Sequence, residues 1–162
     1  MNPDFPQIVD AAVRLRDKYF PNARVSVLSN AVLVGRKDIA DALKKVDNPI
    51  LKIDASSDEL VRKINKPVGK YCLDEIVEAL KSFDGNFILQ TMFLRSNDFD
   101  TTEKAALEAW MDIVREVRPR EIMVYTIDRE TPDKSLGKYT VDEMTAFVQP
   151  LLDEGFKIQI RG

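Results

Sequence analysis

A lysine and an aspartate two residues apart, Lys52 and Asp54, are the residues of this sequence best placed to do chemistry. They lie in segment 50–55, which has the composition of a short apolar strand. Because side chains alternate between the faces of a strand, both charges share one face and the apolar residues share the other. Two charges are costly in a sealed core. We therefore expect this face to line a pocket, a barrel mouth or a ligand; the alternative is a Lys–Asp pair that reaches solvent at a strand end.

The composition excludes several classes of site. The 162-residue chain carries 24 basic and 27 acidic side chains, a formal net charge of −3. This charge gives no electrostatic case for binding nucleic acid or an anionic membrane. One cysteine, Cys72, excludes an internal disulfide and a multi-cysteine metal site, and the lack of histidine removes the commonest general base and zinc ligand. No apolar run has the length of a membrane span and no signal-peptide pattern is present, so we expect a cytoplasmic protein.

Hydrophobic periodicity divides the chain into alternating helices and strands. The predicted strands are 24–29, 50–54, 86–94, 121–127 and 156–160, of which 86–94 is the longest. The predicted helices are 4–19, 37–46, 56–64, 72–83, 100–117 and 140–154, with capping-box spacing at 56–59, 100–103 and 140–143. Strict alternation with helical crossovers implies one parallel α/β sheet. The last strands start about 35 residues apart, as in a β/α barrel, although helix 4–19 has no preceding strand.

Polar residues gather at the predicted carboxyl ends of the strands, where parallel β/α architectures bind their ligands. They are Ser29, Asn30, Lys52, Asp54, Gln90, Thr91, Arg95, Tyr125, Thr126, Asp128 and Arg129. For each of them the alternative is a loop hydrogen bond or a solvated side chain. The sequence has no glycine-rich phosphate motif, and no Ser–His–Asp triad can form without histidine. The only tryptophan, Trp110, is expected in the core.

Several segments together resemble the later part of the radical S-adenosylmethionine (SAM) enzyme barrel. They are 27–30 (Val-Leu-Ser-Asn), 52–55 (Lys-Ile-Asp-Ala) with 59–67, 90–95 (Gln-Thr-Met-Phe-Leu-Arg) and 125–129 (Tyr-Thr-Ile-Asp-Arg). The chain is most similar to small iron–sulfur oxidoreductases and relatives of the pyruvate formate-lyase-activating enzyme. The resemblance implies an α/β fold that is an incomplete (β/α) barrel: about five parallel strands with outer helices in an open, curved sheet. Residues 1–162 would form a single partial domain.

In that family three cysteines at CxxxCxxC spacing hold a [4Fe–4S] cluster, which binds SAM and cleaves it reductively to a 5′-deoxyadenosyl radical. A Gly-Gly-Glu segment on the next strand binds the methionine amino group. Both motifs are absent from this sequence. The resemblance implies that the chain begins just after the Gly-Gly-Glu strand. Because an iron–sulfur cluster needs several cysteine ligands, we expect SAM and the [4Fe–4S] cluster in a full-length parent, and neither bound to this chain. The chain by itself is expected to be inactive.

The resemblance also implies that six residues border a SAM site in the parent: Asn30, Lys52, Asp54, Gln90, Arg95 and Tyr125. Lys52 and Asp54 fall where the fourth strand of the family approaches the ribose and carboxylate of SAM, and Asn30 falls in the third-strand motif. Gln90 and Arg95 would lie near SAM and substrate. Tyr125 would lie on the adenine side.

Two other functions fit the same pattern. One is a non-enzymatic α/β module that binds a small molecule or a protein through the strand-end pocket. The other, a receiver-type regulator, is less favoured because such domains need clustered acidic residues where this chain has Ser29 and Asn30. A fragment would expose the apolar edge that missing strands cover, so we also expect self-association through that edge.

Overall fold

The computed structural model describes residues 2–129 and 131–162; Glu130, in the predicted polar loop 128–139, lies outside the described residues. The helices are α1 (Phe5–Tyr19), α2 (Lys37–Leu43), α3 (Asp58–Asn65), α4 (Leu73–Lys81), α5 (Lys104–Val117) and α6 (Val141–Asp153). The strands are β1 (Ser26–Ser29), β2 (Asn48–Lys52), β3 (Ile88–Met92), β4 (Glu121–Tyr125) and β5 (Ile158–Arg161). Each predicted element is present, with ends that differ by a few residues.

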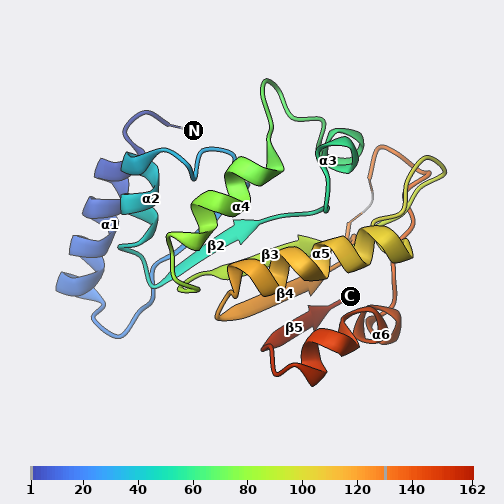
Figure 1. Cartoon of the computed structure of the whole chain (residues 1–162). Coiled ribbons are helices and arrows are strands. Elements are labelled where there is room, and N and C mark those ends of the chain that lie inside the picture. The colour runs from blue at the N-terminus through green and yellow to red at the C-terminus, as the bar shows by residue number, and fades with distance from the viewer. Residues whose placement is uncertain (1, 130) are drawn as a thin grey trace.

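The five strands form one parallel sheet in the order β1-β2-β3-β4-β5, as the alternating pattern predicts. Neighbours in the sheet are neighbours in sequence, and at least one helix connects each pair, which is the connectivity of a β/α barrel. Figure 1 shows α4 and α5 lying along one face of the sheet, with α1 and α2 side by side at the left of the view and α6 beside β5. The sheet is open, because β1 and β5 do not pair with each other.

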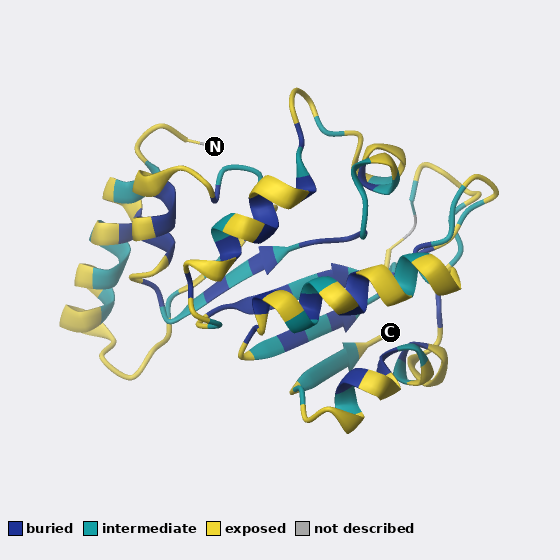
Figure 2. Cartoon of the chain, viewed as in Figure 1, coloured by how far each residue is buried: buried dark blue, intermediate teal, exposed yellow. Residues whose placement is uncertain are grey.

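The helix-covered face of the sheet forms the main core. Leu51, Leu89 and Ile122 lie in register on adjacent strands, and all three are fully buried. They pack with the apolar faces of the helices, which Figure 2 shows as buried patches turned toward the sheet. A smaller cluster centred on Val9 fixes α1 to α2. Burial of this one face leaves the opposite face free to carry polar side chains.

Strand β2 begins at Asn48, two residues before the predicted start, and includes Pro49. Pro49 is in register with Val27 of β1, whereas pairing with β3 begins one residue later, at Ile50 and Ile88. A proline has no backbone N–H to donate, so it is tolerated in a strand where no partner needs that hydrogen bond. Similarly, β3 is shorter than predicted and, at five residues, no longer than β2 or β4.

Of the three predicted capping boxes, the one at 140–143 forms. The Thr140 hydroxyl accepts from the Glu143 backbone N–H at 3.2 Å, and the Glu143 carboxylate accepts from the Thr140 N–H at 2.7 Å. The prediction at 56–59 was wrong by one residue, because Ser57, not Ser56, caps α3. One cap therefore follows its sequence signature and another is displaced.

The predicted box at 100–103 does not form, and α5 starts only at Lys104. The first residue of the predicted box, Asp100, instead accepts hydrogen bonds from the Thr102 N–H at 2.8 Å and from the Tyr139 hydroxyl at 2.6 Å. A short polar side chain can bond to a nearby turn as readily as to a helix terminus. Here Asp100 bonds to the turn at Thr102 and to Tyr139, and does not cap α5.

Candidate functional site

A buried carboxylate at the carboxyl end of β2 is the centre of the candidate site. The Asp54 side chain is completely buried, and its Oδ2 lies 2.9 Å from Lys52 Nζ. The same oxygen accepts a hydrogen bond from the Asn65 side chain at 2.9 Å, and Oδ1 accepts from the Met92 backbone N–H at 3.0 Å. The carboxylate thus joins β2, the end of α3 and β3. Lys52 and Asp54 share one side of the strand, as the period-two pattern predicts, and Asp54 does not reach solvent.

Lys52 is held between its acidic partner and an aromatic ring. Its Nζ lies 5.8 Å from the centroid of the Tyr125 ring, and its side chain is 24% exposed. Burial by itself lowers the pKa of Lys52, but the attraction and hydrogen bonding of Asp54, with a further contribution from Tyr125, outweigh burial and raise that pKa. The ammonium therefore stays charged at neutral pH and keeps one side open to a ligand.

A cavity of about 240 Å³ opens beside this pair. It is lined by Asn30, Val32, Lys52, Asp54, Val61, Asn65, Pro67 and Tyr71. Asn30 is exposed just after β1, with its side chain bonded to the Val32 N–H at 3.3 Å. Three of the six sequence-predicted site residues, Asn30, Lys52 and Asp54, are thus brought together.

Tyr71 gives this cavity a testable pH dependence. Burial, followed by the charges of Asp54 and Asp58, raises the pKa of Tyr71 to about 12. Because the unfolded phenol ionises near pH 10, the stability from the neutral ring is complete below that pH and is lost as the pH rises toward 12. Between pH 10 and 12 we expect the wild type to lose on the order of 2 kcal/mol more of its unfolding free energy than the Tyr71→Phe variant loses.

Urea denaturation at a series of alkaline pH values measures this effect. Tyr19→Phe is the matched control, since Tyr19 is 58% exposed in α1. Equal alkaline sensitivity of wild type and Tyr71→Phe would show that the Tyr71 phenol does not contribute.

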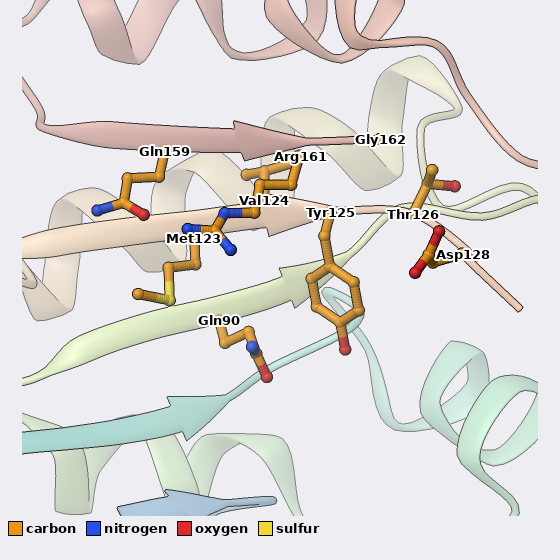
Figure 3. A pocket seen from close by; sticks show the side chains of 9 residues that line it. All are labelled: Gln90, Met123, Val124, Tyr125, Thr126, Asp128, Gln159, Arg161 and Gly162. Atoms are coloured by element: carbon orange, nitrogen blue, oxygen red, sulfur yellow. The ribbon is translucent and has the colours of Figure 1, made fainter. Parts of the chain in front are cut away.

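A second cavity, of about 360 Å³, lies on the face of the sheet that the helices do not cover. Figure 3 shows Gln90 and Tyr125 among the side chains that line it, from β3 and β4. Tyr125 also contacts Lys52. Lys52 and Gln90 are in direct register on β2 and β3. The two cavities therefore lie side by side along the carboxyl ends of the strands.

A third cavity, of about 610 Å³, lies between the end of α3 and the segments that follow β3 and β4. It shares Asn65 with the first cavity and Tyr125 with the second. Its lining combines apolar side chains, such as Leu94 and Phe99, with Asp128 and Arg129. Volumes of this order are typical of small-molecule sites, which span roughly 300–1,000 Å³.

Arg95 does not join the other five predicted site residues. Its guanidinium lies 4.7 Å from the centroid of the Tyr139 ring, and its backbone pairs with Gly137. Arg95 lines none of the three cavities described above. It stabilises the loop before α6.

Two other strand-end residues, Thr91 and Thr126, are buried on the side of the helices. The Thr91 hydroxyl donates to the Ile53 carbonyl at 2.8 Å and accepts from the Trp110 indole N–H at 3.1 Å. The Thr126 hydroxyl donates to the Phe93 carbonyl at 2.9 Å. Both hydroxyls thus connect neighbouring strands, although Thr126 also lines the second and third cavities. Trp110 is in the core, as predicted.

Among the residues that contribute to these cavities and that sequence reasoning missed are Asn65, Tyr71 and Arg161. Arg161 ends β5, so the strand-end rule applied to the last strand would have found it. Asn65 ends α3 and Tyr71 lies in the following loop, and no local pattern links either residue to Asp54.

No group of three or more His, Cys, Asp or Glu side chains arranged to hold a metal ion occurs in residues 2–129 and 131–162. Cys72 is a free thiol immediately before α4. Within the same residues, no helix is both long and apolar enough to cross a membrane.

Several solved structures have the same fold as this chain. The chain superposes over its whole length on a domain of the pyruvate-formate lyase-activating enzyme from Bacteroides vulgatus, with a TM-score of 0.68, 8% identity and 96% of that domain covered. It also matches a radical SAM methyltransferase from Sphaerobacter thermophilus (TM-score 0.64, 16% identity, 84% of this chain and 39% of that one). The chain therefore has the fold of a partial (β/α) barrel, as found in these enzymes.

The same fold occurs in Streptococcus suis SuiB, solved bound to S-adenosylmethionine (TM-score 0.68, 13% identity, 97% of this chain and 36% of SuiB). In sequence the chain is similar to UPF0026 protein MJ1312 of Methanocaldococcus jannaschii, 25% identical over 135 residues and 81% of the chain. It is also similar to UPF0026 protein slr1464 of Synechocystis, 27% identical over 110 residues and 65% of the chain. The chain spans about 40% of the length of both relatives. No protein-family model matches it.

Proposed function

We propose that this chain is the C-terminal part of a radical SAM iron–sulfur oxidoreductase, a partial barrel domain that supplies one wall of the SAM site. The full-length parent cleaves SAM reductively at a [4Fe–4S] cluster, whereas the chain alone is inactive. The observation that carries the proposal is the network of Lys52, Asp54 and Asn65 beside a cavity at the carboxyl ends of the strands of this fold. In parallel β/α folds that end of the sheet is where ligands bind.

The polar groups around this cavity match the chemistry of SAM. The Lys52 ammonium is partly exposed and suits the methionine carboxylate. The amides of Asn30 and Asn65 lie along the same wall and suit ribose hydroxyls, which both donate and accept hydrogen bonds. The Tyr125 ring, at the boundary with the next cavity, offers a face for the adenine. Asp54 fixes the Lys52 ammonium and the Asn65 amide in place.

The residues of this chain do not fit an iron–sulfur cluster. Such a cluster is held by several thiolates, and Cys72 is the only cysteine of the sequence. The cluster and the Gly-Gly-Glu segment therefore belong, in this proposal, to another part of the parent. The contribution of this chain is to bind and orient SAM and substrate.

The first test is the DNA sequence upstream of the Met1 codon. We expect an in-frame CxxxCxxC motif followed by Gly-Gly-Glu. A stop codon and a promoter directly upstream would instead support the non-enzymatic binding module. The second test is formation of 5′-deoxyadenosine by the reconstituted, reduced parent, with this chain alone giving none.

Matched variants of the parent connect that activity to the cavity. We expect Lys52→Gln to raise the KM for SAM about tenfold, as loss of a charge-assisted hydrogen bond does. Lys104→Gln is the control, since Lys104 in α5 is 89% exposed. Equal KM values for the two variants would remove Lys52 from the SAM site.

Self-association is a further expected property of the isolated chain. Strand β1 lies at the end of the sheet order, and Leu28 on it is 62% exposed. Leu15 on the adjoining α1 is 51% exposed. An uncovered apolar edge of this kind favours pairing with another chain. We therefore expect Leu28→Lys to lower the average mass measured by light scattering at high concentration.

Val68→Lys is the control for this prediction, because Val68 is fully exposed in the loop between α3 and α4. A wild-type chain that is monomeric at the same concentration would contradict the prediction.

A further inference from the structure

The second cavity is lined by a cationic side chain, Arg161, that takes no part in the network of Lys52, Asp54 and Asn65. Arg161, at the end of β5, extends across β4 toward Gln90, as Figure 3 shows. Its side chain makes no ion pair or hydrogen bond with the described residues, and it is exposed. The Gln90 side chain is half-buried and likewise has no hydrogen-bond partner among the described residues. Two groups able to donate hydrogen bonds thus face one cavity of about 360 Å³.

The sheet register puts these groups on one face. Arg161 is in register with Tyr125, and Tyr125 with Met92. Gln90 is in register with Met123 on the adjacent row. Met123 and the Tyr125 ring therefore form an apolar floor between the Arg161 guanidinium and the Lys52 network. The cavity combines two charged side chains, Arg161 and Asp128, with an apolar body.

We propose that this cavity binds the carboxylate of a substrate, with Arg161 and Gln90 as its donors and an apolar part of the substrate lying over Met123 and Tyr125. This inference rests on the proposed function, because it assigns the ligand as the substrate that reacts beside SAM. A guanidinium fork matches the two oxygens of a carboxylate and holds them in one plane. The apolar floor selects a hydrocarbon body over a fully polar one.

The same surroundings disfavour a phosphate. Phosphate sites typically collect several cations or the backbone N–H groups of a helix N-terminus. Here Arg161 is the one cationic side chain that lines the cavity in the described part of the chain, and Asp128 is the one acidic side chain. A doubly charged ligand would meet Asp128 with little compensation, whereas a singly charged carboxylate needs only the arginine.

Titration of the ¹⁵N-labelled chain with hexanoate, followed by NMR, tests the proposal. Hexanamide serves as the neutral ligand of nearly the same shape. We expect saturable shifts of the Gln90, Met123 and Arg161 amides with hexanoate, and about tenfold weaker binding of hexanamide. Arg161→Gln is expected to weaken hexanoate binding about tenfold, and Arg161→Lys, which keeps the charge but not the fork, by less.

Arg24→Gln is the control, because it removes the same positive charge as Arg161→Gln at a site far from the cavity. Arg24 is exposed before β1, at the opposite end of the strands. The proposal is overturned if hexanoate does not saturate, if the two ligands bind equally, or if Arg24→Gln weakens binding as much as Arg161→Gln. The titration contains no SAM, so its failure leaves the SAM site standing. Loss of SAM cleavage in the parent with hexanoate binding intact would overturn only the proposed function.

Discussion

Replacing Trp110 with alanine is expected to destabilise the chain by about 3–5 kcal/mol, the range for a large aromatic removed from a core. Trp110 is 1% exposed. Its ring packs edge-on against Phe93, with centroids 5.2 Å apart, and its N–H donates to the Thr91 hydroxyl at 3.1 Å. The substitution leaves a cavity under β3 and removes both contacts. Urea denaturation, with the free energy of unfolding extrapolated to water, measures the loss.

Two variants divide this loss between packing and hydrogen bonding. Trp110→Phe keeps most of the ring contact with Phe93 but removes the indole N–H. Thr91→Val removes the acceptor and keeps the volume. We expect each of these to cost less than half of what Trp110→Ala costs, because packing dominates the total. A loss below about 1 kcal/mol for Trp110→Ala would contradict tight packing at this position.

Trp110 also affects the site indirectly, through a chain of contacts. Its N–H fixes the Thr91 hydroxyl, which donates to the carbonyl of Ile53. Ile53 directly precedes Asp54, so this buried chain helps to set where the carboxylate lies. The sequence predicts Trp110 only as a core residue, because nothing in a helical periodicity indicates which hydroxyl the indole meets.

The fold was predictable because its causes are local and repeated. Alternation of apolar strands with amphipathic helices determines a parallel sheet, and period-two alternation places Lys52 and Asp54 together. The ends of elements were less predictable, since they depend on tertiary partners. Asp100 illustrates this, because the Tyr139 hydroxyl, 39 residues away, engages the carboxylate that the spacing assigns to a helix cap.

The candidate site was predictable only where its residues follow strands. The strand-end rule finds Asn30, Lys52 and Asp54, and applied to β5 it finds Arg161 as well. It also selects Arg95, which lies just beyond β3 but turns toward Tyr139. The direction of a side chain after the last ladder pair is set by the loop, and strand alternation no longer decides it. Asn65 belongs to a helix end and reaches Asp54 only through the packing of α3.

Replacing Asp54 with alanine is expected to cost about 2–4 kcal/mol, because it breaks a buried ion pair and leaves its partners unsatisfied. The Met92 N–H and the Asn65 amide both lose their acceptor. Lys52 loses the carboxylate that keeps its pKa raised against burial. The Lys52 side chain is 24% exposed, so its ammonium can turn toward the cavity when Asp54 is removed. The expected loss of stability is therefore smaller than for a fully buried ion pair. Urea denaturation at neutral pH measures the change.

Asp54→Asn separates the charge from the hydrogen bonds, because the amide oxygen can still accept from Met92 while the negative charge is gone. We expect it to cost less than Asp54→Ala, and a double-mutant cycle with Lys52→Met to give a coupling of about 1–2 kcal/mol. No coupling would mean that the ion pair adds nothing beyond the bonds to Met92 and Asn65. In that case Asp54 would act through its hydrogen bonds alone, holding the Asn65 amide and the Met92 N–H at the end of β2.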